Sequence, residues 1–113
     1  MKLTPEILAE HYDWLRSVKP FCDWKMPARH RMMFRITKNK NRRGYFRPLE
    51  KHWVIAISEE NNKSVGEVQL TMAHEMIHAH IEMRQPRAPH HGELFQECAK
   101  IVCDWFGFDR EKF

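Results

Sequence analysis

The sequence contains few cysteines, and none of them are paired in a recognisable motif. The three cysteines, Cys22, Cys98 and Cys103, form no Cys-x-x-Cys pair, which excludes the usual zinc ribbon and dithiol redox motifs. Cys98 and Cys103 lie in a segment with helical spacing of apolar residues, where a free cysteine usually packs as a small hydrophobic side chain. The cysteines therefore do not indicate a disulfide framework.

Long apolar runs are also missing. No stretch is long enough to span a bilayer, so we expect no membrane partner. The opening residues MKLTPEILAEHYDWLRSVK carry acidic and basic side chains every few positions, unlike a signal peptide. These absences favour an intracellular protein, and they predict no particular oligomeric state.

The residues that are present indicate a folded protein. The chain has 113 residues, of which 42% are hydrophobic, and it contains four tryptophans and seven phenylalanines. This length fits one domain, residues 1–113, with a single core. We expect the tryptophans to lie in that core: Trp14, Trp24, Trp53 and Trp105. The formal net charge of +4 is compatible with nucleic-acid contact, but mild basicity is common among soluble domains.

Three helices are expected, each with a typical capping or stop residue. They cover residues 5 to about 19, 65 to about 84, and about 93 to 106. Thr4 before Pro5 is a typical helix start. Ser64 and Glu67 form a capping-box pattern that begins the second helix. Gly107 follows the third helix as its stop.

Three segments favour β-structure: 32–37, 44–48 and 52–58. The third, HWVIAIS, is the most apolar and is rich in β-branched residues. The first two flank the polar turn KNKNRRG and are expected to form a hairpin. Together with the helices they predict an α+β fold with a small antiparallel or mixed three-stranded sheet.

The second helix contains the stretch TMAHEMIHAHIEM, from Thr71 to Met83. Its His74 and His78 are four residues apart and therefore project from one face of the helix. Two imidazoles in that arrangement can bind one zinc ion. Glu75 lies roughly 100° around the helix, beside such an ion, where it can accept a proton from water. This is the HExxH arrangement of zinc peptidases.

A third ligand is available in the segment APHHGELF. A helix ending near position 84 extends about 9 Å beyond His78. The seven residues from there to His91 can span at most about 25 Å. The chain is therefore long enough to bring His91 back to the other two histidines. Three protein ligands and one water form the open kind of zinc site. The neighbouring histidine and three carboxylates are alternatives: His90, Glu82, Glu93 and Glu97.

The two motifs together resemble the SprT-like family, which includes the Spartan proteases. The residues that carry the resemblance are AHEMIHA at 73–79 and HGELF at 91–95, and the likeness spans about 32 to 106. It implies a minimal zincin-like domain with one Zn²⁺ ion. It also implies His74, His78 and His91 as ligands, Glu75 as the catalytic base, and Phe95 as a packing residue of the last helix. Many relatives carry a C-terminal zinc ribbon, which this sequence lacks.

These observations predict a zinc-dependent endopeptidase that acts on protein or peptide substrates. The resemblance implies that these include proteins associated with DNA, and hence a location in the cytoplasm or on the DNA of the nucleoid. An extended substrate would pair with an exposed edge of the sheet. Two alternatives remain. One is a DNA- or protein-binding module that contains zinc but does not hydrolyse its partner. The other is a peptidase of the carboxylate-ligand type that cleaves repressors, with Glu93 or Glu97 as the third ligand.

Other residues are candidates for contact with substrate or nucleic acid. Tyr45, His90 and Arg87 are candidates for stabilising the oxyanion. Four basic residues near two aromatic ones favour phosphate contact and base stacking: Lys38, Lys40, Arg42 and Arg43. The alternative is a solvated hairpin whose charges keep a sheet edge soluble. His80 points away from the ligand face and is expected to be a packed or surface histidine.

Overall fold

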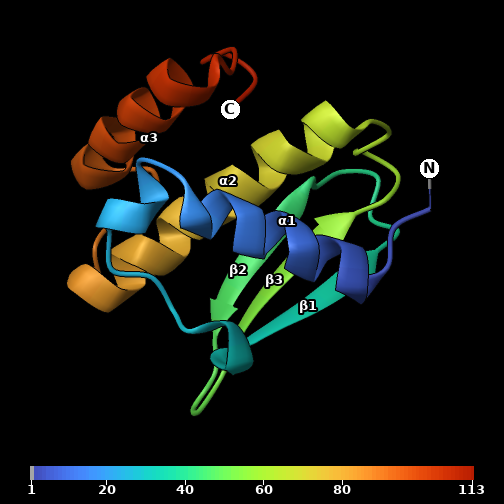
Figure 1. Ribbon diagram of the computed structural model, residues 1–113, viewed down its shortest axis with the longest axis horizontal. Helices are drawn as coiled ribbons and strands as arrows, with labels where there is room; N and C mark the ends of the chain where they lie inside the picture. The colour runs from blue at the N-terminus through green and yellow to red at the C-terminus, as the bar shows by residue number, and fades with distance from the viewer. Residues whose placement is uncertain (1) are drawn as a thin grey trace.

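The computed structural model describes residues 2–113 and has an α+β fold (Figure 1). The chain begins with helix α1 (Pro5–Ser17) and passes through two short 3-10 helices, Phe21–Asp23 and Arg29–Arg31. Three strands follow: β1 (Met32–Thr37), β2 (Gly44–Pro48) and β3 (Trp53–Ser58). The chain ends with the helices α2 (Val65–Arg84) and α3 (Glu93–Phe106). The predicted fold class is therefore confirmed.

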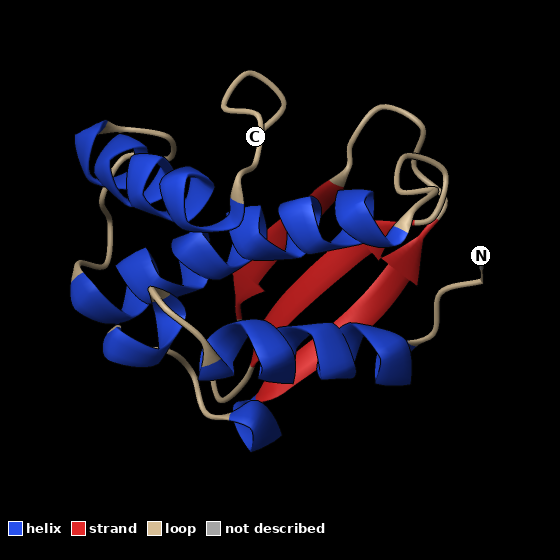
Figure 2. Ribbon diagram, turned by 45° about the horizontal axis from the view of Figure 1, so that its top comes forward, coloured by secondary structure: helices blue, strands red, loops and turns tan. Residues whose placement is uncertain are grey.

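The helices form two layers beside the sheet. Helices α1 and α2 cover the same face, α1 against β1 and α2 against β2 and β3, while α3 packs on α2 (Figure 2). Helix α2 is consequently the central element, and ten of its twenty residues are buried. Across residues 2–113, no helix has the length and apolarity needed to cross a membrane.

The helix ends follow from local sequence. The Thr4 hydroxyl accepts a hydrogen bond from the Ile7 amide at 3.1 Å, and the Ser64 hydroxyl accepts one from the Glu67 amide at 3.1 Å. These bonds satisfy amides that have no partner within the helix. Gly107 has a φ of 72° and ends α3 in the left-handed conformation that glycine adopts readily. The predicted starts and stops are confirmed, except that α1 ends two residues earlier.

The strand order is β1–β3–β2, so the expected hairpin between the first two strands is wrong. Strand β3 lies in the middle, parallel to β1 and antiparallel to β2. Five of its six residues are buried, whereas most residues of β1 and β2 are partly buried or exposed. The most apolar strand gains most from the central position, where strands pair with both of its edges, and this explains the order.

The two faces of the sheet have different surroundings. Phe34 lies 5.5 Å from the ring of Tyr12 in α1, measured between ring centroids, and therefore faces the helices. Phe46 lies on the same face, because both residues pair with Ile55. Side chains alternate along a strand, so Tyr45 points to the opposite face.

The tryptophans only partly follow the prediction of a core position. Trp24 and Trp53 are partly buried against the core. Trp14 and Trp105 are 49% and 59% exposed, so the prediction is wrong for these two. Trp14 belongs to α1 and lies 6.1 Å from Phe106 between ring centroids, and Trp105 lies near the end of α3. Cys98 and Cys103 are free and buried, and Cys22 is free and exposed.

Candidate metal centre

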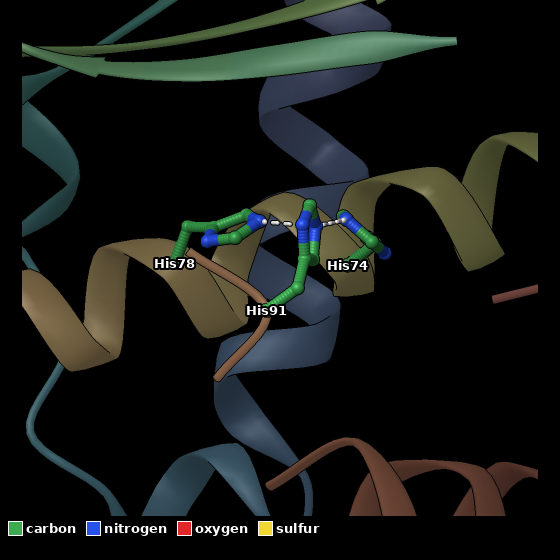
Figure 3. A group of neighbouring side chains, drawn as sticks. All are labelled: His74, His78 and His91. Carbon is green, nitrogen blue, oxygen red and sulfur yellow. Dashed lines mark hydrogen bonds between the residues drawn. The ribbon is translucent and has the colours of Figure 1, made fainter. Parts of the chain in front are cut away.

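Three histidines from two parts of the chain meet beside α2 (Figure 3). His74 and His78 belong to α2, and His91 belongs to the loop that connects α2 to α3. The Nε2 atom of His91 lies 3.1 Å from that of His74 and 3.2 Å from that of His78. One nitrogen of each ring lies within 4.8 Å of the others, so the three residues can bind a single metal ion.

The loop after α2 reverses the chain so that His91 faces the helix. The Gly92 amide donates to the Pro89 carbonyl at 3.2 Å and closes a turn. His91 has a φ of 56°, a left-handed conformation that is uncommon for residues other than glycine. A Cβ at Gly92 would lie 3.1 Å from the Pro89 Cβ, so the turn is tightly packed there. This reversal directs the His91 ring at the two helical histidines.

The two helical histidines are held in their neutral form. Burial lowers the pKa of His74 to about 4 and that of His78 to about 3, since charged imidazolium is poorly solvated there. The Nδ1 atom of His74 lies 2.7 Å from the Phe113 carbonyl oxygen. A carbonyl oxygen only accepts hydrogen bonds, so the proton is on Nδ1 and the Nε2 lone pair is free. A neutral imidazole with a free lone pair is the form that binds metal.

Glu75 lies next to this cluster and is 6% exposed. Burial raises the pKa of its carboxyl to about 8, because desolvation disfavours the charged form, and the positive charge of Arg42 opposes this shift. A buried carboxyl with such a shift, beside three potential metal ligands, is typical of a reactive site.

The histidines and Glu75 line one cleft with a volume of about 310 Å³. Its walls come from α2, the loop before β2, the loop after α2, and the end of the chain. The lining residues are Asn41, Arg42, Arg43, Gly44, Phe46, Leu70, Thr71, His74, Glu75, His78, His90, His91 and Phe113. The cleft is thus rich in cationic and imidazole groups, and Glu75 is its acidic member.

Of the three candidates for oxyanion contact, one lines the cleft and two do not. His90 lines the cleft, and its ring centroid lies 5.2 Å from that of His78. Tyr45 lies on the sheet face away from α2, and Arg87 lies outside the cleft lining. The prediction that Tyr45 or Arg87 contacts the oxyanion is therefore not supported by their positions. Strand alternation explains the position of Tyr45, since Gly44 and Phe46 face the cleft instead.

The four basic residues also divide into two groups. Arg42 and Arg43 line the cleft, whereas Lys38 and Lys40 are exposed on the same loop, outside the lining. The carboxylates considered as alternative ligands are not in the group of three histidines: Glu82, Glu93 and Glu97. His90 is outside that group as well.

The Phe95 ring packs against the rings of all three candidate ligands. It is 3% exposed, and its ring centroid lies 4.9 Å from His74, 4.7 Å from His78 and 4.7 Å from His91. The ring therefore limits how the imidazoles can turn. The resemblance implied that Phe95 packs the last helix, and here it packs that helix onto the candidate metal site.

The sequence patterns did not indicate two residues that fix the elements around the site, Asn62 and Phe113. Asn62 is 2% exposed; its amide donates to the Arg43 carbonyl at 3.1 Å, and its oxygen accepts from the Thr71 hydroxyl at 2.6 Å. It thereby ties the loop before β2 to α2. Phe113 contacts His74, as described above. Neither residue belongs to a motif, so no local signal could have indicated these contacts.

His80 has a structural position, as predicted. It is 4% exposed, its Nδ1 atom lies 2.8 Å from the Lys25 carbonyl, and its ring stacks on Trp24 at 4.8 Å. Its carbonyl partner satisfies one polar atom of the buried ring. His80 therefore belongs to the core and not to the cleft.

The fold and the site define an α+β domain whose central helix carries an HExxH sequence beside a three-histidine candidate metal site. The model of the SprT-like family matches residues 9–111. The chain therefore belongs to the SprT-like family. Comparisons with curated proteins and with solved structures gave no match.

Proposed function

We propose that the protein is a zinc-dependent endopeptidase with His74, His78 and His91 as ligands and Glu75 as the catalytic base. The observation that supports this most strongly is that a buried carboxyl and three clustered imidazoles line the same cleft. A closed structural zinc site has no need of such a carboxyl, whereas a catalytic site keeps one ligand position open. Membership of the SprT-like family agrees with this proposal.

The donor set fits zinc in number and spacing. Two nitrogens, each about 2.0–2.1 Å from a tetrahedral ion, are about 3.3–3.4 Å apart. The two Nε2 separations that involve His91, 3.1 and 3.2 Å, are close to that value, and the three ligand nitrogens all lie within 4.8 Å of one another. When bound, zinc would supply Lewis acidity and bring the pKa of a water ligand toward neutrality.

Glu75 would move the proton during hydrolysis. One of its carboxylate oxygens would accept a proton from the attacking water, and the same group would then donate it to the leaving amine nitrogen. Its pKa in the metal-free chain is about 8, and a nearby cation lowers the pKa of a carboxyl. The group would thus be ionised near neutral pH when the site is loaded, as a base requires.

The substrate would bind as an extended strand along β2. This strand is at an edge of the sheet, and its Phe46 lines the cleft. Main-chain hydrogen bonds to an edge strand give affinity with little sequence selectivity. His90 would contact the carbonyl oxygen of the substrate; its position in the cleft lining next to His78 supports this.

The substrates would include proteins bound to DNA. Arg42 and Arg43 line the cleft, and Lys38 and Lys40 extend the positive charge along the same exposed loop. Clustered cations of this kind bind the phosphate backbone with little sequence preference. A DNA strand beside the cleft would bring its bound protein to the catalytic residues.

The test of hydrolysis compares Glu75→Gln with the wild type in zinc content and in cleavage of casein. We expect Glu75→Gln to bind one zinc ion per chain, and to cleave about 10²–10⁴-fold more slowly because proton transfer is lost. Wild-type protein that binds zinc but cleaves nothing would support the non-hydrolytic binding module instead.

The ligand assignment has its own matched pair of variants. His91→Ala should lose zinc, and Glu97→Ala should retain it, since Glu97 is exposed and outside the histidine group. The reverse result would favour the carboxylate-ligand peptidase.

Histone cleavage with and without single-stranded DNA tests the DNA proposal, which fails if DNA causes no acceleration. Mapping the cleaved bonds tests edge-strand binding, which fails if one residue type flanks every bond.

A further inference from the structure

The segment after α3, residues 107–113, is mostly exposed but turns back so that its last residue, Phe113, reaches α2 (Figure 1). We infer that this segment is a positioning element that orients two of the three candidate ligands, His74 directly and His91 through Gln96. The inference rests on the proposed metal site. It adds to that site residues that do not bind the ion.

The contact with His74 is made by the backbone of Phe113. The Phe113 carbonyl accepts from His74 Nδ1 at 2.7 Å, and the two rings lie 5.2 Å apart between centroids. A metal-bound histidine usually donates its other ring N–H to such a carbonyl or carboxylate, which fixes the ring and makes the ligating nitrogen more basic. The carbonyl therefore presents Nε2 of His74 to the cleft.

The position of Phe113 is set from two sides. The Arg43 guanidinium donates to the Lys112 carbonyl, which holds the residue before Phe113 against the loop that precedes β2. The Phe113 ring stacks on Phe108 at 6.0 Å and on Phe95 at 6.4 Å. The carbonyl that accepts from His74 is thus held by one hydrogen bond and by aromatic packing.

A second connection reaches His91 by way of α3. The Arg110 guanidinium donates to the Gln96 side-chain oxygen at 2.6 Å, and the Gln96 side-chain nitrogen donates to the His91 carbonyl at 3.1 Å. His91 is in the left-handed region, where a residue other than glycine needs support from its surroundings. Gln96 provides that support at the point where the ring turns toward the other two histidines.

The side chain of Gln96 is suited to this role because it is an amide. An amide accepts through its oxygen and donates through its nitrogen, so it can connect a guanidinium to a carbonyl. A carboxylate at the same position would still accept from Arg110 but could not donate to His91. The variant Gln96→Glu therefore removes the contact with His91 and keeps the contact with Arg110.

The test measures zinc affinity of the full chain by competition with a chromophoric chelator. We expect Gln96→Glu and Arg110→Ala to bind zinc about 5- to 10-fold more weakly, somewhat less than is usual for a direct partner of a ligand. Cobalt-loaded Gln96→Glu should also show altered visible absorption, because the arrangement of its ligands changes. Lys100→Ala is the control: Lys100 lies on the same helix, is exposed, and pairs with Asp104 at 2.8 Å.

The outcomes separate this inference from the proposed function. Weaker binding by Gln96→Glu and Arg110→Ala, with Lys100→Ala like the wild type, supports the positioning role. Binding within two-fold of the wild type for both variants overturns it and leaves the zinc site intact. A wild-type chain that binds no zinc overturns both. If Gln96→Glu does not fold, Arg110→Ala decides the test, because it leaves α3 unchanged.

Discussion

Glu75 is a carboxyl placed in the interior of the protein beside basic groups and three imidazoles. An ionised carboxylate loses much of its hydration when it is buried, and the protein raises the pKa of Glu75 to about 8 as a result. The same burial lowers the pKa values of His74 and His78 to about 4 and 3. Without metal, all three groups are therefore neutral between about pH 5 and 7.

These shifts predict how the stability of the zinc-free protein depends on pH. The folded pKa of Glu75 is above its ordinary value of 4.5, so its contribution is fully present below 4.5 and is lost as the pH rises toward 8. The histidines act in the opposite direction, since their lowered pKa values add stability as the pH rises from about 4 to 6.5. Above pH 6.5, the Glu75 effect is left uncompensated.

We expect the free energy of unfolding of the zinc-free wild type to fall by about 1–2 kcal/mol between pH 6.5 and 8, at up to about 1.4 kcal/mol per pH unit. Glu75→Gln has no carboxyl to ionise, so its stability should change little over this range. Urea unfolding followed by tryptophan fluorescence at the two pH values measures the difference. Parallel losses in both proteins would show that Glu75 is not the group responsible.

At the scale of elements, the cleft depends on a close approach between β2 and α2. A Cβ on Gly44 would lie 2.5 Å from the Ala56 carbonyl oxygen, 3.1 Å from the Thr71 Cγ2 and 3.4 Å from a Glu75 carboxylate oxygen. Only glycine allows this separation without movement of the backbone. The residue at the start of β2 therefore sets the distance between the edge strand and the helix that carries Glu75.

The substitution Gly44→Ala should consequently lower the free energy of unfolding by about 1–3 kcal/mol, the range typical of overpacking. It should also reduce cleavage more than zinc affinity, because β2 is displaced from Glu75 while the histidines keep their positions. Gly66→Ala is the control. A Cβ there meets only the Ser64 Oγ at 4.0 Å, so alanine in this helix should be neutral or slightly stabilising. Equal stability of the two variants would contradict the close-packing argument.

The helices could be predicted from sequence because their ends are determined locally. The Thr4 and Ser64 caps and the stop at Gly107 involve contacts within about four residues. The HExxH motif is local for the same reason, since one turn of helix brings His74 and His78 together. His91 could be proposed because chain length allowed the return and because the chemistry needed a third ligand.

The pairing of strands and the contacts between distant segments of the chain could not be predicted. A strand pattern specifies which face is buried but not which strand is the neighbour. The pairing of β1 with β3, and not with β2, which follows it in the sequence, could therefore not be predicted. The exposure of Trp14 and Trp105 depends on which side of each helix the rest of the fold covers. The contacts of Asn62, Gln96 and Phe113 depend on the folded arrangement of several segments, and single-sequence patterns carry no information about that.

At the scale of the whole molecule, the candidate ligands connect the central helix to a loop that has little regular structure. A metal ion that binds only the folded chain stabilises it by mass action, by about 2.7 kcal/mol at a hundred times its dissociation constant. For a domain of this size we expect zinc to raise the melting temperature by roughly 10 °C. Calorimetry with zinc and then with excess chelator measures the shift, and His91→Ala should show none. A similar shift in His91→Ala would indicate that zinc binds elsewhere.

The burial of half of the α2 residues has a consequence for redesign. The helix that carries the two histidines His74 and His78 has ten buried residues, and Glu75 is one of them. Repacking it would disturb both the candidate site and folding, so selectivity has to be varied elsewhere. The segments 38–43 and 85–90, which border the cleft without belonging to a helix or strand and contain none of the candidate ligands, are where a library of variants should be concentrated.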